Sequence, residues 1–495
     1  MANRNNLKFE LKAELPRLTV GETVALCVFE NEAQLSGATG DVLEAIERVL
    51  RDGEFKGEAE SSFVLHDAEL KAAGNLILLG CGESKDSNPS TFSKAAATAV
   101  RSAHSAKAKH LYFVLPRVAN EERTARAIVE GATLGLYENG FYQRREETAA
   151  QLEKVTLIVS GGSDSFRSAT ERGRIVAESV NWTRALADEP GASLPPREFA
   201  RRAAEMAAEF GLKVETLSAA EIEKRGMGGL WGVGKGSDEP PALIVIRYEP
   251  EGASIDDELW AFVGKGITFD TGGISIKHGL DMYEMKTDMA GGAAALGALR
   301  AIAGLKLNRR LVAIVPAAEN MPSGKAIKPG DVIRTLAGYT IEVVDTDAEG
   351  RLVLSDGIAY AKQLGASRIV DLATLTGSII VALGDHRAGL FSNNDEWAKR
   401  VEEAALRAGE PAWRMPVSDD YKKPIESAIA DFKNYGGRPD ATAAALLLSK
   451  FAGDTPWVHL DIAGTSWLDE AQPFAPKGST GAGVRTLVEL VSASS

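Results

Sequence analysis

Three carboxylates and a guanidinium are crowded into the seven-residue segment 345–351, DTDAEGR. The segment follows the apolar run 340–344 and precedes the amphipathic stretch 352–364, an order that predicts a strand, a tight turn and a helix. Carboxylates crowded at a strand end repel each other unless protons, cations or water offset their charge, and the strand ends of α/β sheets are common ligand sites. The same residues also suit helix capping, because Asp is a frequent N-cap and the helix dipole favours anions there. The turn alone therefore leaves both a ligand site and simple capping open.

A second cluster lies upstream, where the apolar run 259–263 leads into the segment 264–277, GKGITFDTGGISIK. Its four glycines let the backbone turn sharply and approach a ligand closely. Lys265, Asp270 and Lys277 are interleaved among them, so acids and bases again lie near the end of a predicted strand.

The two clusters together resemble the leucyl aminopeptidase family, also called the cytosol aminopeptidases. The resemblance extends from about residue 181 to 491 and rests on four motifs: VGKGITFD at 263–270, TDAEGRL at 346–352, DLATLTG at 371–377 and HLDIAGT at 459–465. Motifs of this length are specific, and the sequence is identified as a member of this family.

The spacing between the candidate residues agrees with the same family. Five positions separate Lys265 from Asp270, seven more lead to Lys277, eleven to Asp288 and fifty-nine to Asp347. Asp288 lies just ahead of an Ala-rich segment with strong helix propensity, so capping alone would also explain its position.

The resemblance implies a site for two divalent cations, Mn²⁺ or Zn²⁺, with Co²⁺ and Mg²⁺ as further candidates, since carboxylate oxygens suit these ions. Asp270 and Glu349 would bridge the two cations. Asp347 would bind one of them, and Asp288 together with the amine of Lys265 would bind the other. A lysine ligand needs a free lone pair, so its pKa must fall far below about 10.4, which an adjacent dication can achieve.

Two basic side chains take catalytic roles by the same resemblance. Lys277 stays protonated and stabilises the oxyanion that forms from the substrate carbonyl. Arg351 holds a bicarbonate ion that acts as general base, and a guanidinium fork suits such a planar anion. The implied reaction is the release of N-terminal amino acids from peptides by a water that two metals activate, with Leu and other apolar residues preferred.

The resemblance also implies which residues bind a peptide with a free N-terminus. Asp288 would contact its amine. The residues around its first side chain and backbone would be Met285, Thr374, Leu375, Gly377, Ala463 and Ser466.

Three departures from the family pattern remove none of these ligands. Thr271 replaces the common serine after Asp270, and the segment 435–440 is shorter than usual. Asp345 replaces the usual asparagine and adds a charge beside the predicted metals, which bears on metal affinity and pH optimum.

The bulk composition is that of a soluble globular protein of two or three domains, with 495 residues, 44% hydrophobic and 25% charged. A net charge of −13 argues against a general nucleic-acid or membrane-surface binder. We expect a cytoplasmic protein, because no apolar signal segment follows the N-terminus and no apolar run of about 18 residues occurs. Cys27 and Cys81 lie in apolar stretches, which predicts buried free thiols.

Strand-like and helix-like segments alternate along the whole chain, which predicts an α/β fold. We expect an N-terminal macro-like α/β domain at 1–165, a linking helix at 166–190 and a catalytic domain at 191–495. The catalytic domain would have a mixed, twisted sheet between helices, as the family resemblance implies. The Gly/Ser-rich stretch 160–165 is the predicted boundary.

Other catalytic signals are weak. The segment 229–236, GLWGVGKG, lacks the hydroxyl residue that a Walker A loop needs, and the six histidines form no HExxH pair. His459 lies in an apolar run and is interpreted as structural. The alternative function is a DNA-binding regulatory protein with secondary peptidase activity, which the acidic charge balance disfavours. The family resemblance further implies a homohexamer.

Overall fold

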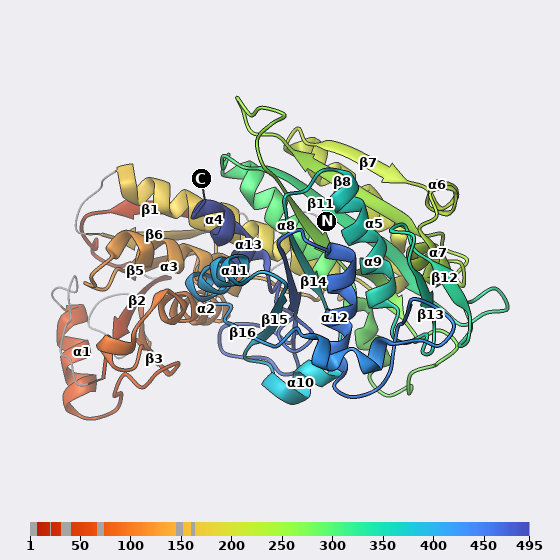
Figure 1. Cartoon of the computed structure of the whole chain (residues 1–495). Coiled ribbons are helices and arrows are strands. Elements are labelled where there is room, and N and C mark those ends of the chain that lie inside the picture. Colours follow the sequence, from red (N-terminus) through yellow and green to blue (C-terminus); the bar gives the residue numbers. More distant parts are fainter. Residues whose placement is uncertain are drawn as a thin grey trace. The chain divides into compact units, whose positions relative to one another are not determined.

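The computed structural model describes residues 7–19, 21–30, 41–66, 74–144, 152–159 and 164–494, and these form two compact units (Figure 1). The N-terminal unit comprises residues 1–181 and 470–477, and the C-terminal unit comprises residues 182–469 and 478–495. The helix α4 (Asp164–Ala187) runs across the division at residue 181. The predicted boundary stretch 160–165 begins with residues 160–163, which lie outside the described residues.

The described strands of the N-terminal unit form one six-stranded sheet in the order β1-β6-β5-β2-β4-β3. All neighbouring pairs are parallel except β3 and β4, which are antiparallel. The strands are β1 (Lys8–Lys12), β2 (Glu22–Val28), β3 (Ser62–Leu65), β4 (Asn75–Gly80), β5 (His110–Val114) and β6 (Lys154–Ile158). The predicted alternation of strand-like and helix-like segments is confirmed by β2, β4, β5 and β6, which are buried apolar runs. β1 and β3 were not expected, because β1 alternates with charged residues and β3 has only four residues.

Both faces of this sheet are covered by helices. One apolar cluster joins α2 (Pro89–Ser105) and α3 (Glu121–Gly135) to the sheet, and another joins α1 (Asp41–Arg51). The predicted buried free thiols, Cys27 and Cys81, lie in the first cluster.

A nine-stranded mixed sheet is the centre of the C-terminal unit, counted over the described residues. Its order is β16-β15-β18-β14-β9-β11-β8-β7, and β10 adds a further parallel pairing to β11. The central strands β18, β14, β9 and β11 are parallel to one another. β8 is antiparallel to both of its neighbours, whereas β15 is antiparallel to β18 and parallel to β16. The strands are β7 (Lys213–Leu217), β8 (Ala242–Tyr248), β9 (Leu259–Gly264), β10 (Gly266–Asp270), β11 (Arg310–Asn320), β14 (Arg368–Ala373), β15 (Ala388–Ser392), β16 (Ala412–Arg414) and β18 (Trp457–Asp461).

Helices pack on both faces of this sheet, which confirms the predicted α/β fold with a mixed sheet between helices. One apolar cluster joins the sheet to α7, α9 and α12, while α8 contacts β9, β11 and β14 and packs on α13. The helices are α5 (Pro196–Glu209), α6 (Ala219–Lys224), α7 (Gly228–Gly234), α8 (Ala290–Gly304), α9 (Gly350–Gln363), α10 (Gly377–Leu383), α11 (Asp395–Ala408), α12 (Asp440–Ala452) and α13 (Val484–Ser492). Among the described residues, no helix combines the length and apolar character needed to cross a bilayer.

The strand ahead of the DTDAEGR turn does not belong to the main sheet. It is β13 (Thr340–Glu342), and it pairs with β12 (Val332–Arg334) and β17 (Phe432–Lys433) in a small separate sheet. The predicted order of strand, turn and helix is confirmed here, but the sequence did not indicate which sheet contains the strand. A short apolar run has the same local pattern in either sheet, and only its pairing partners distinguish them.

Candidate metal centre and substrate-binding loops

The four predicted carboxylate ligands lie at the ends of elements of the C-terminal unit. Asp270 is the last residue of β10, and Asp288 ends the 3-10 helix Met282–Thr287 just before α8. Asp347 lies in the turn after β13, and Glu349 is the N-cap residue of α9. The predicted positions at strand and helix ends are thus found in the structure.

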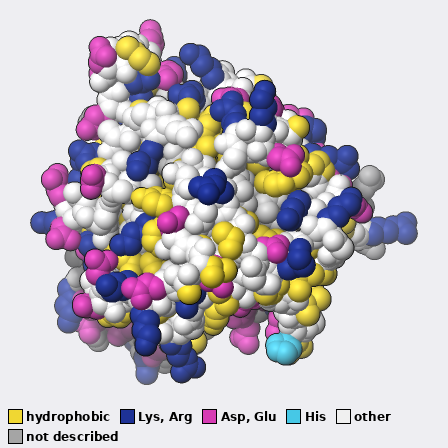
Figure 2. All heavy atoms as spheres, turned by 45° about the vertical axis from the view of Figure 1, so that its right-hand side comes forward, with side chains coloured by type: hydrophobic (Ala, Val, Ile, Leu, Met, Phe, Trp, Pro, Cys, Tyr) yellow, Lys and Arg dark blue, Asp and Glu magenta, His cyan; other side chains and the backbone are white. Residues whose placement is uncertain are grey.

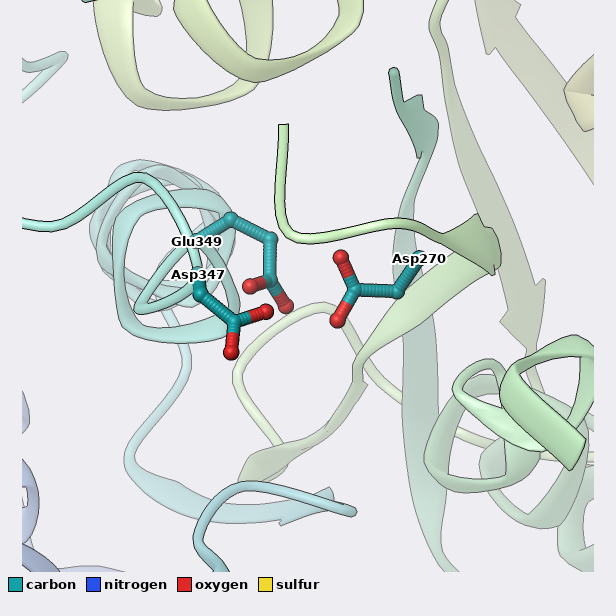
Figure 3. A group of neighbouring side chains, drawn as sticks. All are labelled: Asp270, Asp347 and Glu349. Carbon is teal, nitrogen blue, oxygen red and sulfur yellow. The ribbon is translucent and has the colours of Figure 1, made fainter. Parts of the chain in front are cut away.

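Three of these carboxylates converge on one point, as Figure 3 shows. Each of Asp270, Asp347 and Glu349 offers an oxygen, and these oxygens lie within 4.8 Å of one another. Asp270 and Glu349 are buried, whereas Asp347 is partly exposed. Burial and then the neighbouring charge of Asp270 raise the pKa of Asp347 to about 6, although Lys277 acts in the opposite direction. Burial and Asp270 likewise raise the pKa of Glu349. The cluster therefore concentrates negative charge that a cation would stabilise.

Lys265 lies among the buried carboxylates. Its Nζ atom is 2.7 Å from Glu349 Oε1 and 2.7 Å from Asp288 Oδ2, and it donates to the Thr374 carbonyl at 3.1 Å. Burial opposes the charged form of Lys265, but the attraction of Asp288, Glu349 and Asp270 outweighs it and raises the pKa. With its pKa raised, Lys265 is an ammonium. The resemblance predicts that the same nitrogen, without its proton, is a metal ligand.

Lys277 is the second base of the cluster and lies nearer the solvent, with 24% of its side chain exposed. Its Nζ atom is 2.9 Å from Asp270 Oδ2 and also contacts Asp347 Oδ1. Burial opposes the charged form of Lys277, but Asp270, Glu349 and Asp347 together raise the pKa. Lys277 is therefore charged, as its predicted role requires.

The carboxylate oxygens of the cluster also fit metal ions because three of them are buried without a hydrogen-bond donor among the described residues. Asp288 Oδ2, Asp347 Oδ1 and Glu349 Oε1 are buried and accept no hydrogen bond from any residue that the structure describes. Each is in ion-pair contact with Lys265 or Lys277, so its charge is matched although a directional donor is missing. Buried acceptors are rarely left in this state, and carboxylate oxygens are preferred ligands of hard divalent cations.

Asn320 orients one of the ligands and was not predicted. It lies at the end of β11, and its Nδ2 donates to Asp270 Oδ1 at 2.8 Å and to the Thr346 carbonyl at 3.0 Å. Asp270 Oδ1 also accepts from Gly272 N at 2.9 Å, which leaves Oδ2 facing the cluster. The position of Asn320 at the end of the apolar run that forms β11 was the one sequence signal for this role.

Glycines allow the segments around Lys265 to approach closely. A Cβ atom on Gly264 would lie 2.3 Å from the Gly291 carbonyl oxygen, so β9 and the start of α8 meet backbone to backbone. A Cβ atom on Gly350 would lie 2.7 Å from Lys265 Cε and 2.9 Å from Leu375 Cδ1. The space for the Lys265 side chain therefore depends on glycine in the first turn of α9.

The guanidinium of Arg351 is engaged by protein groups. Its Nη1 donates to the Asn434 carbonyl at 2.8 Å and its Nη2 to Asp440 Oδ1 at 2.9 Å. Arg351 is buried, and Nε donates to none of the described residues. The two terminal nitrogens expected to clamp a bicarbonate thus already have partners.

Asp345, which replaces the usual asparagine of the family, forms a hydrogen bond within the turn that carries Asp347 and Glu349. Its Oδ1 accepts from Asp347 N at 2.9 Å. Asn434, which was also not predicted, holds the same turn from outside, because its Oδ1 accepts from Val344 N at 2.8 Å and its Nδ2 donates to the Ala348 carbonyl at 3.2 Å. No sequence pattern around Asn434 indicated this contact.

The predicted substrate-binding residues fall on three segments of the C-terminal unit. Thr374 connects them to the metal centre, because its Oγ1 donates to Asp288 Oδ1 at 2.7 Å. Met285 is half-buried on the 3-10 helix Met282–Thr287. Gly377 begins α10 and has open space where a Cβ atom would lie, whereas Ser466 is buried. The remaining two residues, each half-buried, are Leu375 and Ala463.

Comparison with known proteins decides the family. A sequence profile described as the catalytic domain of the cytosol aminopeptidase family matches residues 181–488, and one described as that family's N-terminal domain matches residues 25–146. The chain belongs to the cytosol aminopeptidase family. A probable cytosol aminopeptidase of Koribacter versatilis is 44% identical over 481 residues, which cover 93% of each chain. One of Solibacter usitatus is 46% identical over 445 residues, covering 90% of this chain and 92% of the relative.

Solved structures give the same result for this cytosol aminopeptidase. The bottromycin maturation enzyme BotP in complex with Mn superposes with a TM-score of 0.84 at 35% identity, over 96% of this chain and 99% of that chain. A mutant of tomato leucine aminopeptidase superposes with a TM-score of 0.89 at 30% identity, over 100% of this chain and 98% of that one. The family resemblance seen in the motifs is confirmed. The protein is a metal-dependent aminopeptidase, a hydrolase that acts on peptides.

Proposed function

We propose that this cytosol aminopeptidase releases Leu and other apolar residues from the N-terminus of peptides with the help of two divalent cations. The observation that carries the proposal is the convergence of Asp270, Asp347 and Glu349, whose oxygens lie within 4.8 Å of one another. Asp288 extends this set through Lys265, whose Nζ atom lies 2.7 Å from both Asp288 and Glu349. These five residues are the proposed metal ligands.

Mn²⁺ or Zn²⁺ are the proposed cations, with Co²⁺ and Mg²⁺ as alternatives. When bound, the pair supplies an activated water and polarises the carbonyl under attack. The protein's own part is to hold the ligands in place, and buried contacts such as the bond from Asn320 to Asp270 do so. Lys265 must lose its proton to bind a metal, and an adjacent dication lowers the pKa of an amine.

Lys277 is proposed to stabilise the oxyanion of the reacting carbonyl. Its ammonium group lies at the carboxylate cluster and is still reachable from solvent. A charged donor fixed before the reaction begins stabilises developing negative charge without reorganisation.

Arg351 is proposed to anchor a bicarbonate ion as general base. Its terminal nitrogens donate to Asn434 and Asp440, so Nε is the donor left for the anion unless one of these contacts opens. Activity of the metal-loaded enzyme in bicarbonate-free buffer, with and without added bicarbonate, tests this assignment. No response to bicarbonate would contradict it.

The proposed pocket for the first side chain is formed by the residues named above from the family resemblance. The contacts of Thr374 with Asp288 and Lys265 support its place near the substrate amine. An apolar pocket with little charge favours Leu and Met at the substrate N-terminus, because burial of each methylene contributes about 0.8 kcal/mol.

The remaining proposals concern organisation. We place the macro-like domain at 1–165, the linking helix at 166–190 and the catalytic domain at 191–495, and we place the enzyme in the cytoplasm. A homohexamer is also proposed, and four exposed apolar side chains close to the metal centre offer surface for association: Ile274, Ile276, Leu280 and Tyr283. Light scattering at micromolar concentration tests this assembly, and a monomer would contradict it.

The DNA-binding alternative is not favoured. On the face shown in Figure 2, basic and acidic side chains are interspersed and apolar side chains lie between them. Non-specific DNA binding needs a continuous basic surface, and the net charge of the chain is −13.

A direct test uses the purified chain and a panel of aminoacyl p-nitroanilides. The metal-free enzyme should be inactive, and the Mn²⁺-loaded enzyme should hydrolyse the Leu substrate faster than the Ala, Glu and Lys substrates. Asp347→Ala and Glu349→Ala should lose metal and activity together. A loaded enzyme that prefers charged side chains would contradict the proposed specificity.

A further inference from the structure

One buried carboxylate, Asp461 at the end of β18, contacts two separate loops. Its Oδ1 accepts from Leu375 N at 3.1 Å and from Ala463 N at 3.3 Å. Its Oδ2 accepts from Thr376 Oγ1 at 2.7 Å. Both of its oxygens are thus used to bind groups of loops that follow β14 and β18.

These loops carry most of the proposed pocket for the first side chain. The loop after β14 contains Thr374 and leads into α10, whose first residue is Gly377. The loop after β18 contains Ala463 and Ser466, and the Ser466 amide donates to the Ile462 carbonyl at 2.9 Å. β14 and β18 are adjacent parallel strands, so the two loops leave the same edge of the sheet.

Asp461 and the nearby His459 are both buried in the C-terminal unit. Asp461 is 1% exposed and His459 is 0% exposed. Burial raises the pKa of Asp461, and the nearby charge of His459 acts in the opposite direction. His459 in turn bonds to Asp371 Oδ1 through Nδ1 at 2.6 Å, and Trp457 Nε1 donates to Asp371 Oδ2 at 2.5 Å. The interpretation of His459 as structural agrees with these contacts.

We propose that Asp461 is a positioning residue that holds the loops 374–377 and 463–466 in one geometry and thereby sets the selectivity for the substrate's first side chain. This inference rests on the proposed function, which places the pocket between these loops. Asp461 acts through two backbone amides and the Thr376 hydroxyl of the loops, and it touches none of the proposed metal ligands among the contacts described.

The same loop connects the pocket to the metal centre. Thr374 directly precedes the anchored amide of Leu375, and it contacts both Asp288 and Lys265. If the Asp461 side chain is removed, we expect the loop 374–377 to lose its hydrogen bonds to the end of β18. The pocket should then accept side chains less selectively.

The experiment compares Asp461→Ala with wild type in the Mn²⁺-loaded full chain. The readout is the ratio of kcat/KM for leucine p-nitroanilide to that for alanine p-nitroanilide, together with KM, metal content and Tm. We expect the ratio to fall roughly tenfold, the low end of the discrimination that one methylene provides in an apolar pocket. KM for the Leu substrate should rise while bound metal stays at the wild-type level. Asp461→Asn keeps an oxygen for the Leu375 and Ala463 amides and should restore most of the ratio.

Asp371→Ala is the matched control, because Asp371 is equally buried on the neighbouring strand and bonds only side chains, those of His459 and Trp457, among its described contacts. It should lower Tm without changing the Leu-to-Ala ratio. If both alanine variants change the ratio equally, or if Asp461→Ala lowers only Tm, the positioning role is wrong.

Thr376→Val tests the positioning role of Asp461 if Asp461→Ala does not fold. It removes one of the three hydrogen bonds to Asp461 and should lower the ratio severalfold, whereas an unchanged ratio overturns the inference. A wild-type enzyme that hydrolyses neither substrate would contradict the proposed function itself. A wild-type Leu preference that survives these substitutions contradicts this inference alone.

Discussion

Lys265 Nζ lies 2.7 Å from Glu349 Oε1, and this buried ion pair joins the connection between β9 and β10 to the first turn of α9. The backbone of Lys265 is held on both sides, because its amide donates to the Leu372 carbonyl at 3.0 Å and its carbonyl accepts from Gly292 N at 2.7 Å. The side chain is thus aimed at the carboxylates from a rigid support. A ligand amine positioned in this way needs little reorganisation when a cation replaces its proton.

We expect chelation to abolish activity and Mn²⁺, Co²⁺ or Zn²⁺ to restore it, since the carboxylate cluster can activate water only through a cation. Metal binding should also raise Tm, because bound cations stabilise the native state alone. Turnover of leucine p-nitroanilide and elemental analysis on the same samples check this. Full turnover in a preparation verified as metal-free would show the proposal to be wrong.

Lys277→Ala should keep its bound metal but lower kcat by roughly 10²-fold or more, the scale for loss of an oxyanion donor. Lys328→Ala is the control, because Lys328 pairs only with the partly exposed Asp331 among its described ion pairs and should be neutral. Metal content and kcat of both variants are the measurements. If Lys277→Ala loses metal, Lys277 is a ligand and its assigned role is incorrect.

Gly350→Ala should impair metal binding and activity. The new Cβ atom would lie 2.8 Å from Lys265 Nζ, which forces that side chain away from the cluster. Loss of the buried contacts of Lys265 with Asp288 and Glu349 costs more than the roughly 1 kcal/mol by which alanine is favoured over glycine in a helix, so Tm of the metal-free variant should fall. Metal titration and thermal unfolding of the variant separate the two effects, and normal metal affinity would contradict the steric argument.

Asp356 should make stability depend on pH. It is fully buried on α9 and accepts from Leu230 N at 2.9 Å and Leu336 N at 2.8 Å, with no cation among the causes of its shift. Burial raises its pKa from 3.8 to about 7. Because the folded-state pKa is the higher one, its stabilising contribution is complete below pH 4 and is lost as pH rises through 7.

The full difference corresponds to about 4 kcal/mol. In Asp356→Asn this titration is absent, so the Tm of the wild type relative to the variant should fall by a few degrees between pH 5 and 8. A constant offset over that range would show that Asp356 does not titrate as stated.

Ser466→Met should narrow the proposed pocket and penalise Phe more than Ala at the substrate N-terminus. A larger side chain at this buried position removes space that a bulky substrate needs, and differences of this kind amount to about 1–3 kcal/mol. The Phe-to-Ala ratio of kcat/KM is the measurement. An unchanged ratio would place residue 466 outside the pocket.

Local patterns in the sequence were enough to find the family and the central apolar strands of the two main sheets. Apolar runs such as 259–263 and 368–372 are strands because they are long and continuous, a property that burial on both faces demands. The candidate ligands followed from the family resemblance of the long motifs, because the residues alone left helix capping open as an alternative. β1 and β3 were missed because short or alternating strands depend on their partners.

The amino-acid sequence by itself therefore determined the family and the α/β class, and through the family it indicated the residues of the candidate metal centre. Only the tertiary structure decided that β13 belongs to a small separate sheet and that Asn320, Asn434 and Asp461 form hydrogen bonds with segments of the candidate site. Apart from the bond of Asp461 to Ala463 N, these three side chains bind groups 26 to 90 positions away in the sequence. Hydrogen bonds over such separations leave no local periodicity, because they form only after packing has brought distant strand ends together.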